Sequence, residues 1–154
     1  MPLDLLAGDA RGILLTLALE DDDLRDHGAL DAHVSLPGWL DEDGLDAFAS
    51  AVRHVVDTAE PASFTDACRP LDGPDWAGGR ALERLDPSWL EAVARIPDDR
   101  LDEVADRWLA LLDGLPRRPG VSPDGDGTRL ATTRIVEFAR LAAGSPDVLL
   151  GWSL

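Results

Sequence analysis

The chain has 154 residues, of which 45% are hydrophobic, and we expect one domain spanning residues 1–154 around one core. Its 30 acidic and 14 basic residues leave a formal net charge of −16, which disfavours nucleic acid and anionic membranes as partners, because both attract cationic surfaces. The single cysteine, Cys68, excludes an internal disulfide, and the sequence shows neither a leader-like segment nor a long apolar run, so we expect a cytoplasmic protein.

The composition also carries a signal about the host. All basic residues are arginine, and lysine, asparagine, glutamine and tyrosine are absent. Residues with AT-rich codons are scarce, which favours a GC-rich bacterium as the source. A salt-adapted host is the competing explanation, since salt would screen the self-repulsion of so acidic a chain.

The first apolar segment, residues 10–24, fits two structures. The run from Ile13 to Leu19 suits either a buried strand or a helix capped by Asp9, and periodicity alone does not distinguish the two. Residues 32–36 alternate weakly before Pro37, which predicts a short strand or an extended loop.

Helical spacing becomes clear further along the chain. Apolar residues such as Leu45 and Phe48 recur on one side of a predicted helix over residues 43–58, with acids in its first turn. Residues 60–79 are rich in proline and glycine, so we expect a mobile loop there, with a turn of helix around residues 64–68.

Two helices follow in close succession. Asp86 followed by Pro87 is typical of a helix start, because aspartate accepts hydrogen bonds from free amides and proline has no amide to leave unpaired. Pro97 disfavours helical geometry in the residue before it, so this helix ends at Ile96. A second helix then begins with acids in its first turn and ends at Gly114.

The last third of the chain is predicted to contain a loop, a helix and a strand. Glycines and prolines predict a mobile loop near residues 115–127, followed by a helix from about Thr128 to Ala143. Residues 148–154 fit a terminal strand, which we expect to pair with a strand from Ile13 to Leu19. The predicted fold is α+β and predominantly helical, with four to five helices and a small sheet joining the N-terminal and C-terminal segments; an all-α fold is the alternative.

No motif predicts a metal or a cofactor. Asp124, Asp126 and Thr128 match the first three ligands of a calcium loop, but Arg129 stands where the loop needs glycine and Ile135 where it needs glutamate. The chain has no glycine-rich phosphate or dinucleotide motif and no lysine for Schiff-base chemistry. We therefore predict neither a metal nor a cofactor.

An enzyme is the alternative if scattered residues converge in the fold. The histidines lie at no recognised metal spacing, and a lone cysteine is more often a small buried hydrophobe than a nucleophile. The candidates for such a site are His27, His33, His54, Asp66, Cys68 and Asp75.

Five tryptophans are many for a chain with three phenylalanines. Trp89 and Trp108 fall on the apolar sides of predicted helices and are expected in the core. Tryptophan is also enriched in binding hot spots, and two of the five lie in proline- and glycine-rich loops beside acids. The predicted partner-binding residues are Trp39, Trp76, Asp41, Asp43 and Asp75.

These observations favour a protein-binding module without catalytic activity. An acidic surface with tryptophans on loops is suited to a basic protein partner through electrostatic complementarity. Small acidic inhibitors and immunity-type proteins act in this way, and the analogy is one of charge and size only. A structural housekeeping domain is a further alternative.

Overall fold

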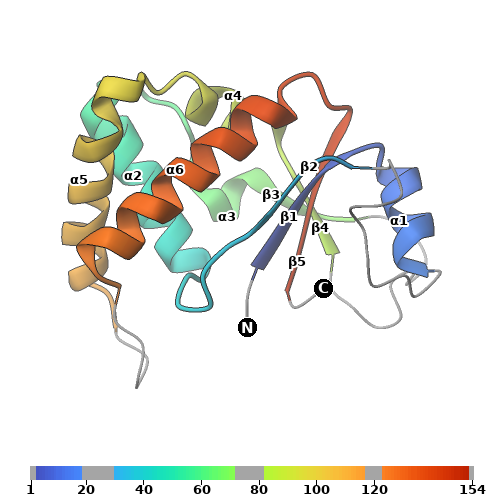
Figure 1. The fold of residues 1–154 in the computed structure, drawn as a ribbon, viewed down its shortest axis with the longest axis horizontal. Helices are drawn as coiled ribbons and strands as arrows, with labels where there is room; N and C mark the ends of the chain where they lie inside the picture. Colours follow the sequence, from blue (N-terminus) through green and yellow to red (C-terminus); the bar gives the residue numbers. More distant parts are fainter. Residues whose placement is uncertain (1–2, 19–29, 72–81, 117–122, 153–154) are drawn as a thin grey trace.

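A five-stranded antiparallel sheet forms the framework of the fold (Figure 1). The computed structural model describes residues 3–18, 30–71, 82–116 and 123–152, with only the backbone described for residues 15–18 and 152. In spatial order the strands are β2 (Leu30–Ser35), β1 (Leu3–Gly8), β5 (Asp147–Trp152), β4 (Leu82–Leu85) and β3 (Cys68–Pro70). The predicted α+β class is confirmed, and the C-terminal strand β5 does pair with an N-terminal strand.

The N-terminal strand is not the predicted one. It is β1, whereas Ile13 lies in helix α1 (Ala10–Ala18). The Asp9 carboxylate accepts a hydrogen bond from the Gly12 amide at 3.0 Å, and the Ile13 amide donates to the Asp9 carbonyl at 2.9 Å, so the capped-helix alternative is correct. All six residues of β1 are buried, and a strand buried on both faces shows no alternation that would mark it in a sequence.

The remaining helices lie together on one side of the sheet, and α1 lies apart from them (Figure 1). They confirm the predicted helices, and α6 begins three residues earlier than expected because Asp124 caps it. The loop predicted over residues 60–79 contains the expected turn of helix but also the strand β3, while its residues 72–79 lie outside the described part. These helices are α2 (Glu42–Val56), α3 (Phe64–Ala67), α4 (Pro87–Ala94), the 3-10 turn η1 (Asp98–Arg100), α5 (Leu101–Asp113) and α6 (Gly125–Ala142).

The core between these helices and the sheet is rich in aromatic rings. Phe48 packs edge-on against Trp108 with ring centroids 4.9 Å apart, and its ring lies 6.0 Å from that of Trp89. Phe64 extends the cluster, edge-on to Trp89 at 5.4 Å. Trp89 and Trp108 are 1% and 0% exposed, which confirms their predicted place in the core.

The two central strands bury side chains on both faces of the sheet. Leu5 and Leu150 are opposite each other in the register and join the core beneath the helices. Leu6 and Leu149, the next pair, join a smaller apolar cluster on the other face with Ile13 of α1.

Candidate functional site

Helix α2 runs antiparallel to α5. The buried Trp108 Nε1 donates to the Gly44 carbonyl at 2.8 Å, which ties the first turn of α2 to the C-terminal half of α5. At the other end of the pair, the Arg100 guanidinium donates to the Val55 carbonyl at 2.8 Å. The start of α2 therefore lies beside the end of α5.

Helix α6 also runs antiparallel to α5. Near its start, Arg129 forms an ion pair with Asp106 of α5, at 3.5 Å between Nη2 and Oδ1. Near its end, Arg140 forms an ion pair with Asp98 of η1 at 2.7 Å. The starts of α2 and α6 and the end of α5 consequently share one end of the molecule.

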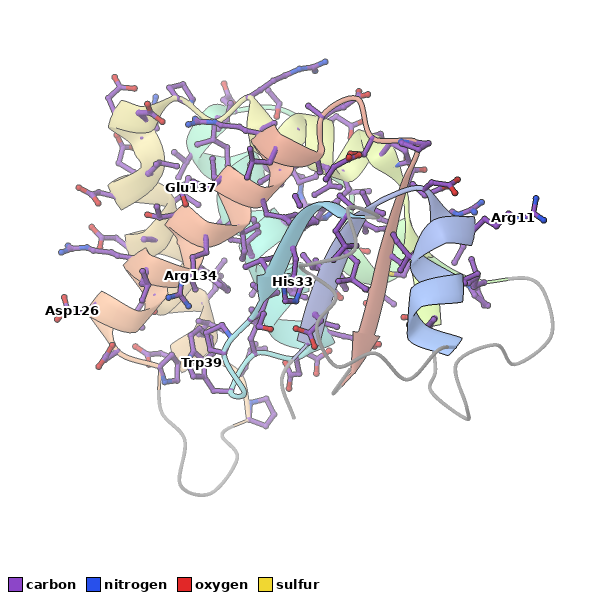
Figure 2. All side chains as sticks on the ribbon, turned by 45° about the vertical axis from the view of Figure 1, so that its right-hand side comes forward. Arg11, His33, Trp39, Asp126, Arg134 and Glu137 are labelled. Carbon is purple, nitrogen blue, oxygen red and sulfur yellow. The ribbon has the colours of Figure 1, made fainter. Side chains whose placement is uncertain are left out.

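Trp39 lies at this shared end, between β2 and α2. Its ring is 5.9 Å from that of Trp108 and is only partly buried. Figure 2 shows Trp39 and Asp126 at the end of the molecule where α6 begins. A large ring held against the core at an accessible position is suited to contact a partner at little entropic cost.

Carboxylates lie at the same end of the molecule as this tryptophan, because helix starts favour acidic residues. Asp41 caps α2 by accepting from the Gly44 amide at 2.9 Å, and Asp124 caps α6 by accepting from the Gly127 amide at 2.6 Å. We call this set of residues the Trp39 end: Trp39, Asp41, Glu42, Asp43, Asp113, Asp124 and Asp126.

Three carboxylates of the Trp39 end are exposed and have no ion pair with any described residue. They are Glu42, Asp43 and Asp126, each in the first turn of its helix. Their charge is therefore directed to solvent. The predicted candidate Asp41 is in addition a structural cap, while Trp76 and Asp75 lie outside the described residues.

A second polar site, which no sequence motif indicated, lies on the face of the sheet opposite the helices α2 to α6. Asp4 of β1 is 5% exposed and lies opposite Ser35 of β2 in the register. Its Oδ1 accepts hydrogen bonds from the Ser35 hydroxyl and from His33 Nε2, the latter at 3.1 Å. These two donors satisfy a carboxylate that burial would otherwise destabilise.

This arrangement is not that of a serine hydrolase. In such enzymes a histidine lies between the serine and the aspartate and removes the proton of the hydroxyl. Here Asp4 lies between the other two, so the Ser35 hydroxyl donates to a carboxylate and Nε2 of His33 is already engaged. The cluster has no activated nucleophile, and its chemistry is that of a satisfied buried carboxylate.

Cys68 is also poorly suited to nucleophilic chemistry. Burial, together with the negative charges of Glu83, Glu42 and Asp46, raises the pKa of the Cys68 thiol to about 12. The neighbouring Arg69 lowers this pKa, but its effect is the smallest of the five. The thiol therefore stays protonated at neutral pH.

The candidates for a catalytic site that lie among the described residues do not converge. Cys68 and His33 lie on β3 and β2, the opposite edges of the sheet, which four strand spacings place roughly 19 Å apart. His54 is exposed on α2 and Asp66 is exposed on α3. His27 lies outside the described residues, and within the described part no three histidine, cysteine or acidic side chains are placed to hold a metal.

A small hollow lies between α4 and the end of α6. It encloses about 160 Å³, less than the roughly 300 Å³ or more that is typical of a small-molecule site. Among the described residues that line it, Glu91 carries the one charged side chain, and the apolar lining includes Pro87, Leu90, Ala139, Ala142 and Val148. The hollow therefore lacks the converging polar groups of an active site.

No protein family model matches this chain, and comparisons with curated proteins and with solved structures found no significant match. Among the described residues, no helix has both the length and the apolar character needed to cross a bilayer. The geometry of the Trp39 end is therefore the basis on which a function is assigned.

Proposed function

We propose that this protein is a cytoplasmic protein-binding module without catalytic activity, and that it docks a basic protein partner at the Trp39 end. The observation that carries this proposal is that three exposed carboxylates without ionic partners among the described residues, Glu42, Asp43 and Asp126, share one end of the molecule with a partly buried tryptophan. Unpaired surface charge steers an oppositely charged protein to its site and selects against acidic ones.

We expect the tryptophan to supply the binding affinity that charge alone does not. Exposed ion pairs contribute about 0.2–1 kcal/mol each, so carboxylates by themselves give weak binding. A ring that packs against Trp108 is already held in place, so little freedom is lost when a partner covers it. We therefore expect Trp39 to provide most of the affinity, and Glu42 and Asp43 to set the association rate and the salt dependence.

The test compares two double variants with the same net charge. Glu42→Gln/Asp43→Asn removes two charges from the Trp39 end, and Asp99→Asn/Asp102→Asn removes two exposed charges without ionic partners among the described residues at the opposite end of α5. Each protein is immobilised and used to capture proteins from an extract of the native host at low and at high salt. Binding of each captured protein, once purified, is then measured by titration calorimetry.

We expect a basic protein that wild type and the Asp99/Asp102 variant retain equally, and that the Glu42/Asp43 variant binds about tenfold more weakly. Trp39→Ala should weaken binding further, and raising the salt concentration should weaken binding to wild type. Equal loss in both double variants would show that only total charge matters. That result, or the absence of a basic partner, would reject the Trp39 end as a docking site.

A further inference from the structure

The outer face of α6 carries a stripe of four exposed residues. Leu130, Arg134, Glu137 and Leu141 follow one another at spacings of four, three and four, so they lie along one side of the helix. Leu130 and Leu141 are 52% and 66% exposed, and they are the large hydrophobic side chains that are exposed among the described residues. Figure 1 shows α6 in front of the other helices, with no described element covering it.

The two charged residues of the stripe are not used within the chain. The other arginines of α6 that form ion pairs do so through its flanks, Arg129 with Asp106 and Arg140 with Asp98. Arg134 and Glu137 are exposed and have no ion-pair partner among the described residues, and Figure 2 shows both on the accessible side of α6. Two leucines and an unpaired charge of each sign are thus presented together to solvent.

The stripe is complementary to the same stripe on a second copy of the chain in antiparallel orientation. If a second α6 lies antiparallel across the first, a residue four positions from one end of the stripe meets the residue four positions from the other end. Leu130 then faces Leu141 of the second copy, and Arg134 faces Glu137, with each contact made twice around a two-fold axis. This match follows from the 4-3-4 spacing and from opposite charges at the two central positions.

We propose that this surface is a homodimer interface in which two copies of α6 pack antiparallel. The stripe is about 16 Å long. The leucines at its two ends provide apolar burial, and the paired charges at its centre fix the register of the two helices. The outer face of a helix of 18 residues is smaller than a standard interface of about 1,600 Å². The dimer is therefore weak, with a dissociation constant on the order of tens of micromolar.

The test is sedimentation equilibrium over about 5–300 µM protein at about 0.15 M salt, a range set by the affinity expected for a small interface. Wild type should dimerise within this range. Arg134→Glu and Glu137→Arg should each weaken the dimer about tenfold, because each places like charges opposite one another twice. The double variant Arg134→Glu/Glu137→Arg restores opposite charges and should recover the wild-type affinity.

The Glu137→Arg variant separates specific pairing from general repulsion. It makes each chain less negative, so repulsion between two chains of charge −16 falls, yet the proposed register predicts weaker association. Arg11→Glu is the control that matches Arg134→Glu in charge, and Figure 2 shows Arg11 on the side of the molecule away from α6. This control should leave the dimer unchanged, and circular dichroism of each variant checks that α6 still folds.

A wild-type protein that stays monomeric throughout the range would overturn the proposal, as would a dimer that the single reversals leave intact or that the double variant fails to restore. Repulsion between acidic chains also predicts tighter dimerisation as salt rises from about 0.05 to 0.15 M, within the range where screening is incomplete. Docking of a basic partner has the opposite salt dependence and depends on Glu42 and Asp43, so failure of one proposal is distinguishable from failure of the other.

Discussion

The surroundings of Cys68 oppose ionisation of its thiol. With its pKa raised to about 12 by burial and by nearby carboxylates, about one thiol in ten thousand is ionised at pH 8. Free cysteine, with a pKa of about 8.5, is about one quarter ionised at this pH, so we expect alkylation of Cys68 by iodoacetamide to be about two thousandfold slower than alkylation of free cysteine, and to accelerate as pH rises towards 12. Quenched-flow labelling followed by mass spectrometry measures both rates.

Removing one of the carboxylates that act on Cys68 should partly reverse this effect. Glu83→Gln removes the largest of the charge effects but leaves burial, so the alkylation rate should rise only a few-fold. Glu91→Gln, an exposed change on α4, is the matched control and should not alter the rate. A thiol that reacts in the wild type as fast as free cysteine would contradict this account.

The buried Asp4 carboxylate should make the loss of its histidine donor costly. His33→Ala removes one of the two donors to Oδ1 and should lower the free energy of unfolding by about 1–2 kcal/mol, because the carboxylate stays buried and under-satisfied. In the double variant Asp4→Ala/His33→Ala no carboxylate remains to be satisfied, so part of this loss should be recovered. Urea denaturation of the wild type, the two single variants and the double variant gives the coupling energy between Asp4 and His33. If the losses of unfolding free energy in the single variants simply add up to the loss in the double variant, the hydrogen bond contributes nothing.

Individual residues also show what sequence can and cannot reveal. The core positions of Trp89 and Trp108 were predictable because helical spacing marks a buried stripe. The partner of His33 was not, because it depends on strand pairing between residues 29 positions apart. Trp39 was predicted as a binding residue, but its tilted contact with Trp108 follows only from the antiparallel packing of α2 and α5.

At the scale of elements, the start of α4 gives a test of capping. The Asp86 carboxylate accepts a hydrogen bond from the Ser88 amide at 2.9 Å, and this bond lowers the pKa of Asp86. Since the carboxylate is exposed, solvent screens its charge and the hydrogen bond carries most of the effect. Asp86→Ala should therefore cost about 1 kcal/mol of stability at neutral pH, whereas Asp86→Asn, which can still accept the bond, should cost less.

The pH dependence of this cap has a definite sign. A lowered carboxyl pKa in the folded state stabilises the protein above the ordinary aspartate pKa of about 3.9, and this stabilisation is lost as pH falls through the folded-state value. The difference in unfolding free energy between wild type and Asp86→Ala should thus narrow between about pH 5 and pH 3. A difference that stays constant over this range would show that the ionised carboxylate is not what caps the helix.

The elements that sequence predicts well are those with local signals. Caps, prolines and a 3.6-residue period located α2, α4, α5 and α6, because each of these signals acts within a few residues. The strands β3 and β4 have three and four residues, too few to show a period. They exist because β4 pairs with β5, which is distant in the chain, and β3 in turn pairs with β4. The Trp39 end is formed where three helix ends meet. The sequence indicated residues of this site, but it did not predict that the three helix ends lie together.

At the scale of the whole molecule, the surplus of negative charge should oppose folding. Among the described residues, the four exposed or partly exposed ion pairs, such as Arg140 with Asp98, contribute at most about 1 kcal/mol each, and they leave the net charge of −16 in place. Raising NaCl from about 0.05 to 0.5 M should therefore raise the melting temperature by several degrees. Differential scanning calorimetry measures this, with sorbitol at equal osmolality as control; a fall in melting temperature would mean that the ion pairs dominate.

Strand β5 has a consequence for how the protein is made. It is the one strand that joins β1 to β4, so without it the described sheet separates into an antiparallel β2–β1 pair and an antiparallel β4–β3 pair. Isolated two-stranded hairpins are marginal in water. Because β5 follows every other described strand in the sequence, a ribosome delivers the joining strand after both pairs have emerged. Nascent chains shorter than about 147 residues therefore lack the strand that joins the two pairs, and their apolar strands are exposed to aggregation or to chaperones until β5 is made.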